Sequence, residues 1–203
     1  PIAESTGHIQ AIGDWVLETA IREFKELQKA YPHVKRIAIN VSALQLREAS
    51  FMGRLKELMN KHQVTPTFIE LEITESLLVD GGDEMLMKLS SLKEMGVSIS
   101  LDDFGTGYSS LNYLRLLPIN RVKIDRAFIS QVEEDPKVHA IVKSIIDLSH
   151  RLDFDVVAEG VETIGQLNQL KDWHVDVIQG YYFSRPLNQT SLEEFLQKES
   201  NPT

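Results

Sequence analysis

Two adjacent carboxylates, Asp102 and Asp103, are the residues of this chain whose types most directly suggest chemistry. They follow residues 97–101, where apolar residues alternate with serines in the pattern of a β-strand. Because neighbouring carboxylates repel each other, a divalent cation that neutralises them stabilises the pair. Residues 104–107 contain two glycines and predict a turn. A solvated turn that binds nothing is the alternative interpretation of these residues.

The same layout, a strand that ends in polar side chains, recurs along the chain. The polar residues are Asn40, Glu72 with Glu75, Asp102 with Asp103, Lys123 with Asp125, Glu159 with Glu162, and Gln179. In a parallel barrel the C-terminal ends of the strands share one face, where catalytic groups lie. Because six successive strands end in this way, one shared site is a better explanation than six separate helix-capping residues.

The candidate ligands are carboxylate and amide oxygens, without histidine or cysteine. Oxygen ligands suit Mg²⁺ or Mn²⁺ better than zinc. Two such ions can activate water and stabilise the leaving oxygen in phosphoester cleavage. A different hypothesis makes Lys123 the Schiff-base nucleophile of an aldolase-like barrel. Carboxylates around a lysine favour its charged form, which is the wrong form for a nucleophile.

Composition narrows the class of protein. The chain has 203 residues, 42% hydrophobic and 25% charged, which is typical of a soluble globular domain. A net charge of -9 argues against binding of a nucleic acid polymer along the surface. The absence of cysteine excludes disulfides and a thiol nucleophile. No apolar run is long enough to span a membrane and no signal peptide is visible, so we expect a cytoplasmic domain without membrane contact.

The elements that position these residues alternate in type. Strands are predicted over residues 37–41, 68–73, 97–101, 121–125, 155–159 and 176–181. Helices are predicted over residues 9–30, 51–62, 83–95, 109–117, 136–150 and 163–173, and a last one is capped by Ser191 and Glu194. Such alternation predicts an α/β domain of parallel strands, either a doubly wound sheet or a (β/α)8 barrel. The absence of a glycine-rich dinucleotide fingerprint weakens the first choice.

Six ordered motifs resemble those of the EAL-domain cyclic di-GMP phosphodiesterases. They are INVSA, LEITES, LDDFGTGYSSL, VKIDRAFI, VAEGVE and QGYYFSRPL. The resemblance covers essentially the whole chain from the PIAESTG segment onward. It implies a (β/α)8 TIM-type barrel with one strand opposite to the others, and metal-dependent hydrolysis of cyclic di-GMP to pGpG in bacterial signalling. A homodimer is expected.

The resemblance also implies a two-metal site. By position, Asn40, Glu72 and Asp102 match the ligands of one ion. Asp102, Asp103 and Glu159 match those of the second ion, so that Asp102 bridges the pair. The ions would be Mg²⁺ or Mn²⁺.

Four further residues match positions with other roles in the family. Lys123 matches the lysine that holds the attacking water, and Glu162 and Gln179 match residues that orient ligands and water. Glu75 matches the glutamate that steadies the loop after the Asp-Asp pair.

The chain departs from the family at its front, where the Glu-Ala-Leu segment is absent. We expect residues 1–203 to form the C-terminal three quarters of an EAL domain, with six of eight strands and the first two upstream of Pro1. The intact parent would be a phosphodiesterase, and this fragment would be inactive. The alternative is a catalytically silent module that binds cyclic di-GMP or a protein.

Overall fold

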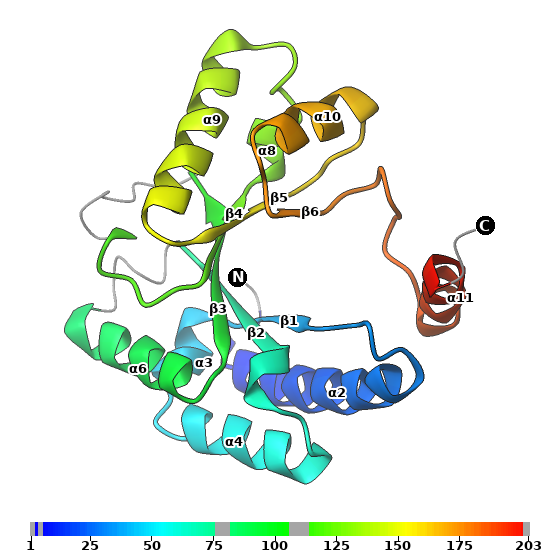
Figure 1. Ribbon diagram of the computed structural model, residues 1–203. Helices are drawn as coiled ribbons and strands as arrows, with labels where there is room; N and C mark the ends of the chain where they lie inside the picture. The colour runs from blue at the N-terminus through cyan, green and yellow to red at the C-terminus, as the bar shows by residue number, and fades with distance from the viewer. Residues whose placement is uncertain (1–2, 4–5, 76–81, 106–113, 201–203) are drawn as a thin grey trace.

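A computed structural model describes residues 3, 6–75, 82–105 and 114–200. Six strands, parallel and in chain order, form one sheet that curves into a half-barrel (Figure 1). The strands are β1 (Ile37–Asn40), β2 (Ile69–Thr74), β3 (Ser98–Phe104), β4 (Arg121–Ile124), β5 (Asp155–Ala158) and β6 (Val177–Ile178). This confirms the predicted α/β class with six parallel strands.

Helices lie outside the curved sheet, except for α11, which lies at its open side (Figure 1). They are α2 (Ile9–Ala30), α3 (Ala43–Arg47), α4 (Phe51–His62), α6 (Gly82–Glu94), α8 (Arg126–Ile129), α9 (Pro136–Arg151), α10 (Ile164–Asp172) and α11 (Gln189–Ser200), with a 3-10 turn η1 (Pro66–Phe68). Two helices begin at the capping residues that the sequence predicted. Asp135 caps α9 ahead of Pro136, and Thr163 with Gln166 forms the capping box of α10.

The structure differs from the sequence prediction near the C-terminus. β6 has two residues because Tyr182 N–H donates to Val161 O at 2.9 Å, which turns the chain away from the ladder. The predicted cap of α11 was wrong: Asn188 Oδ1 accepts from Ser191 N–H at 3.0 Å, and the helix begins at Gln189. Helices α3 and α8 were not predicted. The predicted helix 109–117 lies largely outside the described residues.

The two faces of the sheet differ in chemistry. Side chains alternate along each strand, so every second residue faces the helices. That face is apolar and includes Ile39, Ile69, Leu71, Ile99 and Val122, all buried in the core beneath the helices. The inner face carries charged residues and serines: Glu70, Glu72, Ser98, Ser100, Asp102, Lys123 and Glu159. Apolar burial therefore stabilises the outside of the half-barrel, and the inside is available for polar chemistry.

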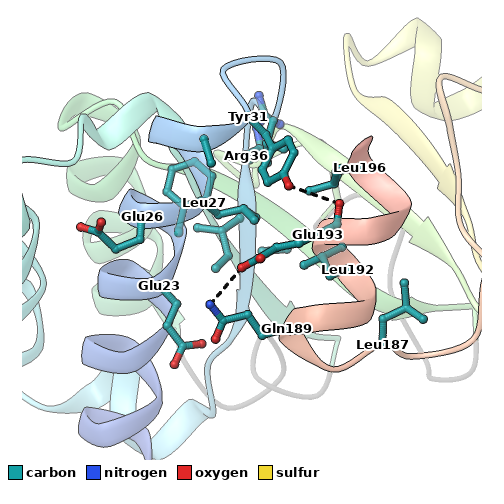
Figure 2. A pocket seen from close by; sticks show the side chains of 15 residues that line it. Glu23, Glu26, Leu27, Tyr31, Arg36, Leu187, Gln189, Leu192, Glu193 and Leu196 are labelled. Carbon is teal, nitrogen blue, oxygen red and sulfur yellow. Dashed lines mark hydrogen bonds between the residues drawn. The ribbon is translucent and has the colours of Figure 1, made fainter. Parts of the chain in front are cut away.

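Helix α11 lies at the open side of the sheet. Within the described residues, β1 pairs only with β2, and β6 only with β5. A cavity of about 500 Å³ separates α11 from α2 and β1, and apolar residues such as Leu27, Leu192 and Leu196 line it (Figure 2). Tyr31 Oη donates to Glu193 O at 3.3 Å across this cavity. In the described part of the chain, no helix combines the length and the apolar character needed to cross a bilayer.

Candidate active site

Three carboxylates converge on one ammonium group inside the half-barrel. Lys123 Nζ on β4 lies 2.8 Å from Glu72 Oε1 of β2 and 3.0 Å from Asp102 Oδ1 of β3. It lies 2.7 Å from Glu159 Oε1, directly after β5. The Lys123 side chain is only 5% exposed, and the three carboxylates are 11–17% exposed. Four predicted site residues are thus brought together where parallel strands end.

The charges in this cluster do not balance. Burial alone would lower the pKa of Lys123, but hydrogen bonds to Glu159 and Glu72 raise it above its ordinary value, so the lysine stays charged. Burial raises the pKa of Glu72 and of Glu159, although Lys123 opposes that rise. Their repulsion with Asp102 adds to it. One ammonium thus faces three carboxylates, and the excess negative charge would favour a further cation.

The Asp102–Asp103 pair lies on a bulge of β3. The pairing with β4 shifts register between Leu101 and Phe104, and Asp103 has a left-handed backbone with φ 54°. Asp103 N–H donates to Asp102 Oδ1 at 3.1 Å. Burial, with the nearby Asp102 charge, raises the pKa of Asp103. We expected the strand to end here, but it continues to Phe104 and bulges instead, which changes the direction of successive side chains.

Glu75, directly after β2, contacts the turn that follows the pair. Its carboxylate is buried, and Oε2 accepts from Gly105 N–H at 3.3 Å. Gly105 has φ +94°, and an added Cβ would lie 2.9 Å from Phe128, so this tight turn requires glycine. Residues 106–113 lie outside the described residues.

The remaining predicted residues lie around the cluster without joining it. Asn40 is aligned with Glu72 in the register of β1 and β2. Glu162 is paired at 2.7 Å with Arg126, which sequence reasoning missed. The Gln179 backbone bonds both Ala158 O and Val161 N–H, and its side chain is exposed.

Arg126 connects three loops. Besides its ion pair with Glu162, the Arg126 side chain packs against Gly160, where an added Cβ would lie 2.3 Å from Arg126 Cγ. The Arg126 guanidinium lies 5.8 Å from the Tyr181 ring centroid. Arg185 lies over the same ring at 5.1 Å. The loops after β4, β5 and β6 are therefore held together by one arginine. The DR pair after the fourth strand was the available signal for it.

The donor set suits a hard divalent cation, since it consists of carboxylate oxygens that carry excess negative charge. Among the described residues, no three acidic or histidine side chains are arranged to hold a metal ion. Lys123 Nζ lies within 3.0 Å of Glu72, Asp102 and Glu159, at the point where the three carboxylates converge. The chemistry of the ligands fits, and the lysine ammonium takes the central place.

Residues 1–186 match the family model described as EAL domain. The chain belongs to the EAL family. This EAL domain is 42% identical over 196 residues to the cyclic di-GMP phosphodiesterase NbdA of Pseudomonas aeruginosa. The matched region covers 97% of this chain and 25% of NbdA. The chain spans about a quarter of the length of the curated relatives it matches.

Solved EAL structures share the fold. The PaMucR phosphodiesterase in complex with c-di-GMP is 41% identical, with a TM-score of 0.89 over 95% of this chain and 78% of that one. Klebsiella pneumoniae BlrP1, solved as a manganese and cy-diGMP complex, is 28% identical, with a TM-score of 0.75 over 86% of this chain and 45% of that one. The half-barrel thus matches the fold of EAL TIM-type barrel domains, as the motifs implied.

Proposed function

We propose that this EAL domain is part of a cytoplasmic phosphodiesterase that hydrolyses cyclic di-GMP to linear pGpG with Mg²⁺ or Mn²⁺. The observation that carries the proposal is the convergence of Glu72, Asp102 and Glu159 on Lys123 at the C-terminal ends of parallel strands. Relatives named as phosphodiesterases and structures of c-di-GMP complexes support the substrate.

In this proposal the acidic residues hold two ions. Asn40, Glu72 and Asp102 bind the first, and Asp102, Asp103 and Glu159 bind the second. The ions supply Lewis acidity, which lowers the pKa of bound water and stabilises the leaving oxygen. The left-handed backbone of Asp103 turns its carboxylate relative to that of Asp102, which supports separate roles for the two neighbours.

The other residues position water and loops. Lys123 binds and orients the attacking water, whose oxygen forms a bond to phosphorus while the bond from phosphorus to the 3′ oxygen breaks. That 3′ oxygen takes up a proton, and the product keeps a 5′ phosphate. Glu162 and Gln179 orient water and ligands from the loops after β5 and β6. Glu75 holds the turn after β3 through its bond to Gly105.

Chromatography of cyclic di-GMP and pGpG tests the reaction. Activity should vanish in EDTA and return with excess Mn²⁺ or Mg²⁺, and undiminished cleavage in EDTA would refute the metal mechanism. Binding of cyclic di-GMP without any cleavage, in a chain with all eight strands, would instead identify a silent binding module.

We also propose that two strands upstream of Pro1 close the barrel, because a barrel of this type has eight strands. Within the described residues, β1 and β6 each pair on one side only, which leaves both edges of the sheet open. The 203-residue chain should hydrolyse negligibly and self-associate through its open edges. A chain extended upstream should recover activity. Full activity of the monomeric 203-residue chain would contradict this proposal.

A further inference from the structure

A second charged cluster lies on the same inner face, nearer the start of the strands. Glu70 Oε2 accepts from Arg36 Nη1 at 2.7 Å and from Arg121 Nη1 at 2.8 Å. Arg121 Nε donates to Asp155 Oδ2 at 3.1 Å. The Glu70 side chain is 4% exposed and that of Arg121 is 18% exposed. This lower cluster therefore connects the segment before β1 with β2, β4 and β5.

The lower cluster lies directly below the candidate site. Glu70 precedes Glu72 by two residues on β2, and Arg121 precedes Lys123 by two residues on β4. Two residues of a strand span about 7 Å, and their side chains leave the same face. β2 thus carries both Glu70 and Glu72, and β4 carries both Arg121 and Lys123. The same two strands therefore supply the upper and the lower contact.

Both contacts pass over β3, which lies between β2 and β4. Strands two apart in a sheet are separated by about 10 Å, so only long side chains above a small residue can meet. β3 supplies such residues: Ser98 is aligned with Glu70, and Ser100 is aligned with both Glu72 and Arg121. Ser100 is fully buried, and its hydroxyl has no hydrogen-bond partner among the residues that the structure describes.

We propose that Glu70 and Arg121 are positioning residues, which fix β2 against β4 so that Glu72 and Lys123 stay in contact. The Arg121 guanidinium suits this role because its rigid fork binds Glu70 and Asp155 at once. Ser100 leaves the space that both contacts need. The inference rests on the proposed function, because it says which residues orient two members of that site: Glu72, the proposed metal ligand, and Lys123, the proposed water-binding lysine.

The first test uses two variants: Arg121→Lys replaces the fork and keeps its charge, and Glu70→Gln removes the charge of the partner. In a chain with all eight strands, each should lower Mn²⁺ affinity, measured by calorimetry, and kcat by about 10- to 100-fold, as loss of outer-shell partners does. KM should change by less than about threefold, because substrate contacts remain. Arg22→Lys is the matched control: its pair with Glu23 is exposed on α2, and affinity and kcat should stay at the wild-type values.

The second test changes space and leaves every charge in place. Ser100→Val should reproduce the loss of Mn²⁺ affinity and kcat, since the added methyl groups lie beneath both contacts. A crystal structure of Arg121→Lys without metal should show Glu72 Oε1 and Lys123 Nζ separated beyond their present 2.8 Å.

A merely structural role would give a different result. If the variants lose thermal stability while Mn²⁺ affinity, kcat and the 2.8 Å contact stay unchanged, the inference is wrong. The crystal structure and the Mn²⁺ titration need no substrate, so they decide this inference even if the domain fails to cleave cyclic di-GMP. Failure of wild-type cleavage would contradict the proposed function alone.

Discussion

Removal of the central ammonium should destabilise the domain far more than loss of an exposed lysine. In Lys123→Met the side chain keeps most of its volume but loses its charge, and three carboxylates with 11–17% exposure then face one another. Removing one partner of a buried ion pair costs about 3–5 kcal/mol. For a domain of this size, each kcal/mol lowers the melting temperature by about 2–4 °C, so we expect a decrease of about 6–20 °C in EDTA.

Urea and thermal unfolding, followed by circular dichroism at about pH 8, measure this effect. Lys29→Met is the control, since Lys29 also forms a 2.7 Å ion pair, with Glu26, but the two side chains are 60% and 66% exposed. Exposed pairs contribute about 1 kcal/mol or less. Excess Mn²⁺ should restore much of the stability of Lys123→Met by neutralising the carboxylates. Equal effects of the two substitutions in EDTA would refute the view that the cluster is a coupled buried unit.

Three further results are expected. In a chain with all eight strands, Asp102→Asn should weaken both metal binding and substrate binding, whereas Lys123→Ala should lower kcat with little change in substrate affinity; identical profiles would disprove the assigned roles. Glu75→Ala should reduce kcat about tenfold without unfolding the domain, because it removes the bond to the turn after β3; wild-type activity would contradict that anchoring. Burial would raise the pKa of Asp176, but bonds from Val156 N–H and His150 hold it below the ordinary value of an aspartate, so its stabilising effect is present above that ordinary value and is lost as pH falls through the lowered pKa. The stability difference between wild type and Asp176→Asn, from urea titrations, should therefore shrink in strong acid, and a constant difference would refute this.

Much of the site could be predicted because the fold places strand ends together. Glu72, Asp102 and Lys123 each lie in the C-terminal part of a strand and Glu159 directly follows one, and parallel pairing alone brings these ends to one edge. The register that completes their contacts depends on long-range packing. For that reason the sequence predicted the members of the cluster but not the central position of the lysine ammonium.

The lower cluster shows why other features were missed. Glu70 and Arg121 look like the polar half of strands with one solvated face, a pattern common in proteins. Only the curvature of the sheet makes that face an interior, where the two side chains can meet above Ser100. The start of α11 was mispredicted for a local reason, since Asn188 and Ser191 are both good caps and the structure uses Asn188.

The left-handed backbone at Asp103 has a consequence for how this position can vary. Asparagine and aspartate tolerate such angles better than other non-glycine residues do. Conversion to asparagine would thus remove the charge at little conformational cost, whereas glutamate would keep the charge but fit the bulge poorly. Under the proposed metal-binding role of Asp103, divergence from an active to an inactive domain at this position would therefore pass through a single amide, and the chemically closest acid would be disfavoured.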